Sequence, residues 1–249
     1  MGHEKTVIGG IPVLVSRPAV GEPAPLVLLS HWFSGSKEGW LERLDELSKK
    51  GYFTVAMDNR LHGERAGAGL ESLLPEGKLD VPGLRRVMQE TAADISTLVD
   101  YFSLDEAVAS DRIGVTGISM GGFVSFAALV NDPRIKVATP IIASPYWGDI
   151  PGDTPVDLDA EAEADLADFS PTNEPSGRME TIPPRALLMQ IGAEDVHYNC
   201  RRVEIFYEEL RELYGDQAER LRLIVYPFVG HECTPEMWAN AVAWLGKYL

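Results

Sequence analysis

The segment with the clearest chemical potential is Gly117-Ile118-Ser119-Met120-Gly121, which directly follows the apolar run Ile113–Thr116. A Gly-x-Ser-x-Gly pattern between a strand and a helix predicts a sharp turn that lifts the serine hydroxyl above the sheet edge. Glycine flanks the serine because so tight a turn leaves no room for side chains. The pattern therefore predicts Ser119 as a nucleophile, with the first amides of the following helix directed at developing negative charge.

A serine hydroxyl needs a base within hydrogen-bond reach to become nucleophilic at neutral pH. His231 lies between a predicted strand, Leu221–Tyr226, and a predicted last helix, Pro235–Tyr248. That position is a loop at the carboxyl edge of the sheet, where Ser119 is also expected. We therefore predict His231 as the base. The alternatives are His31, His62 and His197.

The base needs a carboxylate that fixes its tautomer and stabilises the imidazolium ion. Asp195 follows the predicted strand Ala186–Ile191 and lies between the serine and the histidine in chain order, as in one class of catalytic triad. Glu194 is the adjacent alternative, with a side chain expected to point elsewhere. The sequence thus predicts Ser119, Asp195 and His231 as catalytic residues.

Developing charge on a substrate oxygen needs preorganised donors. The backbone N–H of Met120, directly after the nucleophile, is the first expected donor. The second should come from the loop after the predicted strand Leu26–Ser30, with the amide of Phe33 preferred and that of Trp32 second.

Several other residues are candidates for substrate binding. Aromatic side chains at predicted loop positions would wall an apolar pocket, although core packing is the ordinary role of such residues. His62 would position substrate, and the alternative is that the segment Asp58–Arg65 is a hydrogen-bonded structural turn. The substrate-binding candidates are Trp32, Tyr146, Trp147, Tyr198 and His62.

Metal and cofactor signals are weak. His62 with Glu64, or His231 with Glu232 and Cys233, lack the spacing of a metal site, so no metal is expected. The sequence has no glycine fingerprint for a nucleotide, and no cofactor is expected. Two cysteines without a CxxC pattern favour reduced thiols over a disulfide.

The elements that must position these residues alternate along the chain. Predicted strands are Pro12–Ser16, Leu26–Ser30, Phe53–Met57, Ile113–Thr116, Val137–Ala143, Ala186–Ile191 and Leu221–Tyr226. Predicted helices are Gly39–Lys50, Leu84–Phe102, Met120–Val130, Asn199–Tyr214 and Pro235–Tyr248. Alternating strands and helices predict an α/β fold with a doubly wound, mainly parallel sheet.

One region interrupts this alternation. Residues 140–184 hold eight of the 17 prolines, and residues 149–180 hold ten acidic side chains against one basic. We expect a single domain, 1–249, with a short acidic, proline-rich cap insertion at about 144–182 over the carboxyl edge of the sheet, where open α/β sheets bind ligands. The alternative is a long surface connection without a binding role.

The formal net charge of −16 argues against nucleic acid or anionic membranes as partners, because phosphates would be repelled. No run of eighteen apolar residues is present, so no membrane span is expected. The N-terminus lacks the apolar core of a signal peptide. These features predict a cytoplasmic protein, monomeric or homodimeric, that acts on a small molecule.

Taken together, the motifs resemble the α/β-hydrolase superfamily. The resemblance rests on Gly117–Gly122, Gly192–Asp195, Gly230-His231, His31-Trp32-Phe33 and Asp58–Arg65. The chain is similar to small bacterial serine esterases of the dienelactone-hydrolase and prolyl-oligopeptidase-like branch. Trp32 stands where relatives usually have glycine. Serine replaces the cysteine nucleophile of dienelactone hydrolases proper, which argues against that activity.

The resemblance implies a serine carboxylesterase (an α/β-hydrolase with catalytic triad and oxyanion hole) that hydrolyses small, short-acyl carboxylic esters through an acyl-enzyme intermediate. A thioesterase, lactonase or acyltransferase would use the same triad, and a peptidase would share the catalytic parts. A non-catalytic binding protein of the same fold is the alternative from a different class.

Overall fold

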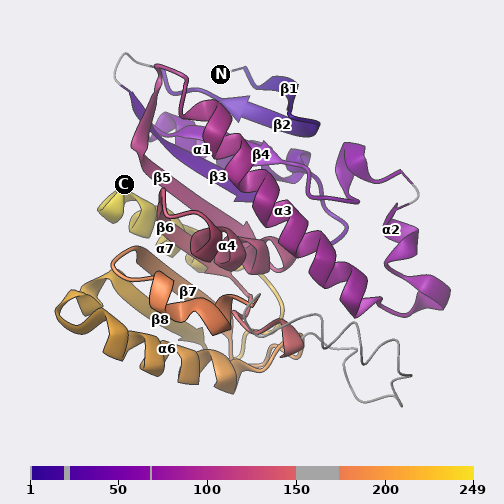
Figure 1. The fold of residues 1–249 in the computed structure, drawn as a ribbon, viewed down its shortest axis with the longest axis vertical. Helices are drawn as coiled ribbons and strands as arrows, with labels where there is room; N and C mark the ends of the chain where they lie inside the picture. Colours follow the sequence, from indigo (N-terminus) through magenta and orange to yellow (C-terminus); the bar gives the residue numbers. More distant parts are fainter. Residues whose placement is uncertain (1, 20–22, 68, 150–173) are drawn as a thin grey trace.

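The computed structural model describes residues 2–19, 23–67, 69–149 and 174–249. Within them, eight strands form one sheet in the order β1-β2-β4-β3-β5-β6-β7-β8 (Figure 1). The strands are β1 (Glu4–Ile8), β2 (Ile11–Ser16), β3 (Ala24–Ser30), β4 (Phe53–Met57), β5 (Val108–Ile118), β6 (Ile135–Ile141), β7 (Ala186–Gly192) and β8 (Leu221–Tyr226). β2 pairs antiparallel with β1 and β4, and all neighbours from β4 to β8 pair parallel. The predicted mainly parallel sheet is confirmed.

Helices cover both faces of the sheet, which explains the continuously apolar central strands. Along β3, Leu26 and Leu28 pack into one core cluster, whereas Val27 and Leu29 pack into the other. The first cluster lies under α3 (Val81–Phe102), α4 (Met120–Asn131) and α6 (Cys200–Tyr214), and the second under α1 (Leu41–Lys49) and α7 (Pro235–Tyr248). This two-sided cover confirms the doubly wound arrangement.

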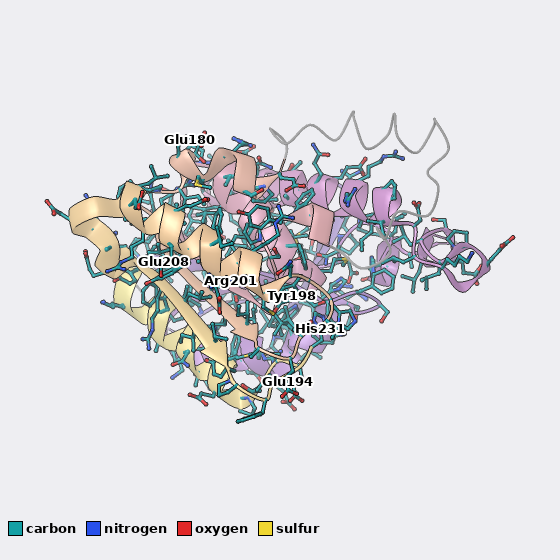
Figure 2. All side chains as sticks on the ribbon, turned by 90° about the horizontal axis from the view of Figure 1, so that it is seen from below. Glu180, Glu194, Tyr198, Arg201, Glu208 and His231 are labelled. Carbon is teal, nitrogen blue, oxygen red and sulfur yellow. The ribbon has the colours of Figure 1, made fainter. Side chains whose placement is uncertain are left out.

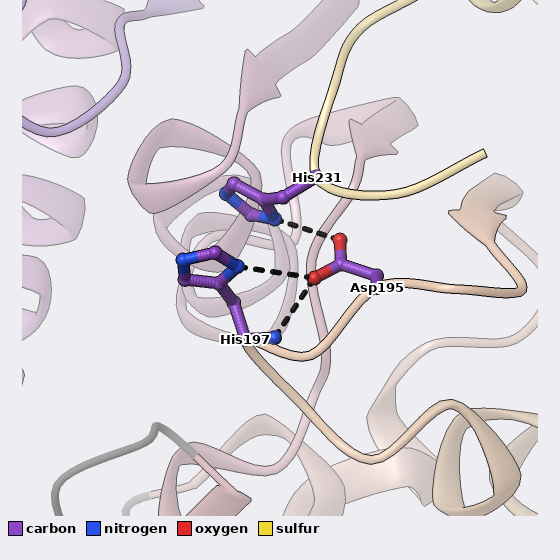
Figure 3. A group of neighbouring side chains, drawn as sticks. All are labelled: Asp195, His197 and His231. Carbon is purple, nitrogen blue, oxygen red and sulfur yellow. Dashed lines mark hydrogen bonds and ion pairs between the residues drawn. The ribbon is translucent and has the colours of Figure 1, made fainter.

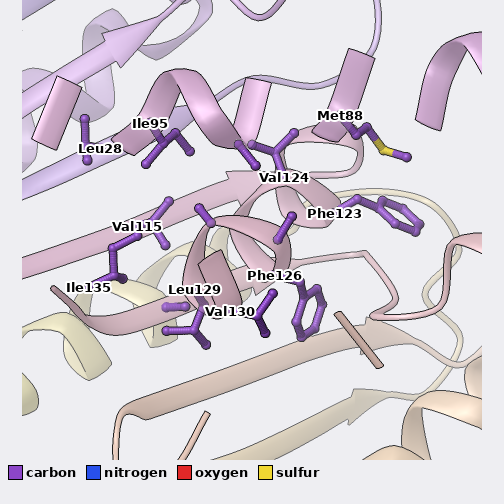
Figure 4. Packing of buried hydrophobic residues seen from close by; sticks show 14 of the residues in the cluster. Leu28, Met88, Ile95, Val115, Phe123, Val124, Phe126, Leu129, Val130 and Ile135 are labelled. Atoms are coloured by element: carbon purple, nitrogen blue, oxygen red, sulfur yellow. The ribbon is translucent and has the colours of Figure 1, made fainter. Parts of the chain in front are cut away.

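Helix α4, which begins directly after Ser119, is buried on all sides. Every residue from Met120 to Val130 is buried, as expected of a helix without a polar face. Figure 4 shows Val124 of α4 in the same buried cluster as Ile95 of α3 and Val115 of β5. Because so much apolar surface holds α4 in place, the turn before it has a rigid support.

Some boundaries differ from those predicted. Strand β1 was not among the predicted strands, although it pairs with β2 along its whole length. Helix α3 begins at Val81, earlier than expected, because the carboxylate of Asp80 accepts a hydrogen bond of 3.1 Å from the amide of Gly83. Helix α7 begins as predicted, with the Thr234 hydroxyl accepting from the amide of Met237.

An irregular excursion separates β4 from α3. It contains the short helix α2 (Gly69–Ser72) and 3₁₀ turns at Gly63–Arg65 and Pro75–Gly77. The periodicity of the sequence did not indicate this excursion. It matters for function because it brings Leu74 and Leu79 to the cavity described below.

The expected cap insertion, 144–182, lies largely outside the described residues, which omit 150–173. No helix in the described ranges is long and apolar enough to cross a membrane.

Candidate active site

The turn between β5 and α4 holds Ser119 in an unusual backbone conformation, with φ of 55° and ψ of −120°. A non-glycine residue at positive φ is strained and persists only where its surroundings enforce it. The enforcing contacts come from close backbone approaches. A Cβ atom on Gly117 would overlap the carbonyl of Gly121, and one on Gly121 would overlap the carbonyl of Ser30. Both positions therefore leave no room for a side chain. The absence of a Cβ on Gly121 lets the start of α4 lie against the end of β3.

Ser119, His231 and Asp195 form one hydrogen-bonded chain. The Ser119 Oγ lies 2.7 Å from Nε2 of His231, and Nδ1 of His231 lies 2.7 Å from Oδ2 of Asp195. The acceptor-only carboxylate requires the proton on Nδ1, which leaves Nε2 free to accept the serine proton. The structure thus brings together the three residues expected to form the triad, from positions 112 and 36 residues apart in the chain.

The loops that carry Asp195 and His231 are joined by backbone hydrogen bonds. The amide of Ala193 donates to the carbonyl of Tyr226 at 2.9 Å, and the amide of Glu194 donates to that of Val229 at 2.9 Å. A Cβ on Gly192 would overlap the Val229 carbonyl. These contacts fix the carboxylate and the imidazole relative to each other, which explains the glycine at the end of β7.

Asp195 is shared by two histidines (Figure 3). Its Oδ1 accepts a 2.9 Å hydrogen bond from the backbone amide of His197 and lies 3.4 Å from Nδ1 of that residue. Burial raises the pKa of Asp195, but the hydrogen bonds from His231 and His197 outweigh it, so the pKa lies below its ordinary value. The carboxylate is therefore ionised at neutral pH, as an orienting group should be.

The loop after β3 lies beside the start of α4 and contains Trp32 and Phe33, the expected second donors. His31 holds this loop in place through both ring nitrogens. Its Nδ1 lies 2.7 Å from the carbonyl oxygen of Trp32, and its Nε2 accepts a 3.1 Å hydrogen bond from the backbone amide of Asn59. The Asn59 side chain in turn donates to the His31 carbonyl at 2.9 Å and accepts from the Ser30 hydroxyl at 2.9 Å. Asn59 thereby positions the loop from the end of the neighbouring strand β4.

His31 uses both ring nitrogens in this network and is completely buried. One nitrogen accepts and the other donates, so the ring must be neutral. Burial lowers the pKa of His31 from about 6.5 to about 4. Because neither nitrogen is free for proton transfer, His31 fits a positioning role rather than the base role weighed for it above.

The segment Asp58–Arg65 is a tightly bonded turn. The buried carboxylate of Asp58 accepts from the Lys37 amide at 2.9 Å, the Lys37 ammonium at 2.7 Å and the Glu64 amide at 3.0 Å. The Lys37 ammonium also contacts the Glu64 carboxylate. On the other side, Arg65 donates to Asp94 of α3 at 2.7 Å. These bonds match the structural interpretation of this segment.

A cavity of about 650 Å³ opens beside Ser119. Its described lining is mostly apolar and includes Trp32, Phe33, Leu74, Leu79, Leu84, Met88, Ile118, Met120, Phe123 and Ile142. Polar groups are few: Ser119, His231, His197, Arg43 and Cys233. Such a lining suits a small, largely apolar ligand that a few polar groups orient.

Four of the expected substrate-binding residues are absent from the described lining of this cavity. Trp147 is completely buried, and Tyr146 packs against Phe206. Tyr198 is buried beside His231, with ring centroids 6.3 Å apart (Figure 2). His62 is buried behind Phe33, with an edge-on ring contact at 5.3 Å. Of the five candidates, the structure brings only Trp32 to the described cavity wall, because the other four rings pack against other side chains or are buried in the interior.

A metal ion would find one grouping of suitable ligands among the described residues, formed by Asp195, His197 and His231. The Nδ1–H of His231 already bonds to Asp195. A cation between these groups would displace that proton and break the chain to Ser119. Both cysteines are free thiols.

Comparison with known proteins identifies the family of this chain. A family model described as serine aminopeptidase, S33 (Hydrolase_4) matches residues 21–181. The chain belongs to this family. The match confirms the expected membership of the α/β-hydrolase superfamily.

Two curated relatives and one solved structure align along nearly the whole chain. "Putative esterase YitV" of Bacillus subtilis is 26% identical over 257 residues, covering 99% of this chain and 98% of the relative. Esterase YjfP of Escherichia coli K12 is 24% identical over 266 residues, with 99% and 98% covered. The crystal structure of TT1662 from Thermus thermophilus superposes with a TM-score of 0.78 at 26% identity, with 99% and 97% covered.

Sequence reasoning missed three parts of the site. Asn59 lies two residues after the end of β4, and a polar residue at that carboxyl edge was an available signal. The stacking of His197 on His231 gave no signal, because it depends on two loops meeting. Arg43 gave none either, since it occupies an ordinary position on the predicted helix Gly39–Lys50.

Proposed function

We propose that this S33-family chain is a serine carboxylesterase that hydrolyses small, short-acyl carboxylic esters through an acyl-enzyme intermediate. The observation that carries the proposal is the hydrogen-bonded chain Ser119–His231–Asp195 at an apolar cavity. The relatives named as esterases align over nearly the full length of both partners, which supports an ester-hydrolysing enzyme.

Acylation begins when the Ser119 hydroxyl attacks the ester carbonyl carbon while its proton passes to Nε2 of His231. The same proton then goes to the leaving alcohol as the tetrahedral intermediate collapses. In the second half, His231 removes a proton from water as the water oxygen attacks the acyl-enzyme. When this second intermediate collapses, the bond to Ser119 Oγ breaks, His231 returns the proton to that oxygen, and the carboxylic acid leaves. Asp195 stabilises the imidazolium ion in both halves.

The oxyanion of each intermediate is assigned to backbone donors. Met120 is the first residue of α4, so its backbone N–H has no carbonyl acceptor one turn earlier in the helix. The amide of Phe33 is the proposed second donor, with that of Trp32 as the alternative. The bonds from His31 and Asn59 preorganise this loop, and preorganised donors contribute most where water is excluded.

The test combines labelling with turnover. A fluorophosphonate probe should label Ser119 in the native protein, as read by peptide mapping, and p-nitrophenyl acetate should be hydrolysed. Ser119→Ala should abolish both, whereas Ser103→Ala, at the end of α3, should leave both unchanged. An unlabelled Ser119 together with no turnover of any ester would instead favour a binding protein.

The same panel separates the alternatives with shared chemistry. It should include short-chain thioesters, a lactone and aminoacyl p-nitroanilides beside p-nitrophenyl acetate and butyrate. The proposal expects the highest kcat/KM on the short oxygen esters. A clear preference for the aminoacyl anilides would assign the protein to peptidase activity.

A further inference from the structure

Arg43 is the one arginine or lysine in the described lining of the cavity that also contains Ser119 and His231. It projects from α1, a helix that contributes nothing to the proposed proton transfers. The hydrolytic mechanism therefore leaves this cation without a role.

The guanidinium group of Arg43 is held beside the loop that carries His231. Its central carbon lies 5.1 Å from the ring of Trp40 and 4.9 Å from the ring of Trp238. Its Nη2 lies 3.8 Å from Sγ of Cys233, which is two residues after His231. Since two residues span at most about 7 Å, the guanidinium lies close to the catalytic loop.

The aromatic cradle around Arg43 is itself fixed. The indole N–H of Trp238 donates to the Glu46 carboxylate at 2.7 Å, and the ring of Trp40 lies 5.9 Å from that of Trp238. The nearby acid Glu46 is thereby bonded to the tryptophan and paired with Lys50 rather than with Arg43. The guanidinium is oriented by ring faces, which leave its in-plane N–H donors available.

The absence of a carboxylate partner distinguishes Arg43 from other arginines near the site. Arg60 and Arg65 both form ion pairs with Asp94. Within the described residues, Arg43 forms no ion pair within 4.0 Å, although the chain carries 38 acidic residues. The Arg43 guanidinium has five N–H donors, and the Cys233 sulfur beside it is only a weak acceptor. This arrangement suits the binding of a planar anion.

We infer that Arg43 binds a carboxylate group of the substrate, so that the preferred esters are those carrying a free carboxylate. This inference rests on the proposed function, because it places the scissile ester at Ser119. A carboxylate on the substrate would form the bidentate ion pair that Arg43 does not form with the described residues. The apolar side chains of the cavity would contact the carbon chain of the substrate.

The experiment compares charged esters with near-isosteric neutral amides. One pair carries the carboxylate on the alcohol part, 4-acetoxybutanoate against 4-acetoxybutanamide. The other carries it on the acyl part, monoethyl glutarate against its terminal amide. Hydrolysis is followed by proton release at about 0.15 M salt, where long-range repulsion from the acidic surface is screened.

The wild-type protein should prefer the anionic member of at least one pair by about 30-fold in kcat/KM, as expected for charge-assisted hydrogen bonds. Arg43→Met should remove that preference mainly through a higher KM. The amides should be turned over within about threefold of the wild-type rate. Arg43→Lys should retain part of the preference, because it keeps the charge but not the planar fork. Lys49→Met, which removes one exposed charge from the same helix, should change nothing.

Two results would overturn the inference. One is equal wild-type turnover of anionic and neutral esters in both pairs. The other is an equal loss on all substrates in Arg43→Met together with a lower Tm, which would make Arg43 only a clamp between α1 and α7. In either case hydrolysis of neutral esters would leave the proposed function standing. Failure of the wild-type protein to hydrolyse any ester would reject the proposed function itself.

Discussion

The imidazole ring of His197 stacks on that of His231, with centroids 4.1 Å apart and ring planes inclined by 34°. The two rings share the carboxylate of Asp195, one on each oxygen. His231 is therefore held in its plane by Asp195 and on one face by His197. This second restraint orients the nitrogen that meets Ser119.

Removing the stacked ring should weaken this restraint without removing a proton-transfer group. His197→Ala is expected to lower kcat/KM for p-nitrophenyl acetate by about two- to tenfold, the range that aromatic pair energies imply. His197→Phe should recover most of the loss, because it restores a ring face, and the backbone amide that bonds to Asp195 persists in both variants. An unchanged rate in His197→Ala would mean that the stack does not orient His231.

Changing the acid tests which carboxylate orients the base. Asp195→Asn should lower kcat by about 10³- to 10⁴-fold, because an amide favours the wrong imidazole tautomer. Glu194→Gln should leave kcat within about twofold, since the Glu194 side chain is exposed and it is the Asp195 carboxylate that bonds to His231. Steady-state kinetics of both variants, with circular dichroism as a folding control, decide the matter. A large loss in Glu194→Gln alone would reverse the assignment of the acid.

Substitutions in the buried pair Lys37–Asp58 test the stability of the turn Asp58–Arg65, which follows β4. Both side chains are fully buried. Burial alone would lower the pKa of Lys37, but its hydrogen bonds to Asp58, Glu64 and Glu38 raise it above its ordinary value. Lys37→Met would leave the Asp58 carboxylate unpaired, which should lower the free energy of unfolding by about 3–5 kcal/mol.

The matched control is the double variant Lys37→Met/Asp58→Leu, which removes both charges and should recover part of the lost stability. Urea unfolding at pH 7.5 measures both variants. A loss below about 1 kcal/mol in Lys37→Met would show that water reaches the pair and solvates Asp58.

His31 should make stability depend on pH. Its pKa in the folded protein is about 4, below the ordinary value near 6.5, because burial disfavours the charged ring. The unfolded chain therefore takes up this proton first, so the free energy of unfolding falls as pH drops from about 6.5 to about 4. At about 1.36 kcal/mol per pKa unit, the full effect is about 3 kcal/mol.

Carboxylates also titrate in part of this range, so the measurement is the difference between wild type and His31→Gln. The variant is expected to be less stable at pH 7.5, where its loop hydrogen bonds are altered, but to lose less stability between pH 6.5 and pH 4. Parallel slopes for the two proteins in urea unfolding would show that His31 is not held neutral by burial.

The sequence by itself determined the alternation of strands and helices, since apolar runs of strand length and amphipathic helical patterns are local properties. It also determined the sharp turn at Ser119, because the flanking glycines are required by a turn that only a few residues define. Chain order then singled out Asp195 and His231. The strands, the helices and the turn at Ser119 depend on local signals, whereas the choice of Asp195 and His231 also used their order along the chain.

Tertiary structure alone decided what surrounds those groups. Whether an aromatic side chain lines a cavity or lies beneath it depends on how separate loops pack, which is why Trp147 and Tyr198 lie elsewhere than expected. The stacking of His197, the support from Asn59 and the placement of Arg43 all join residues distant in sequence. Such contacts arise from the mutual packing of elements. A local pattern can place Asn59 at the edge of the sheet, but it does not give the partners that Asn59 bonds to.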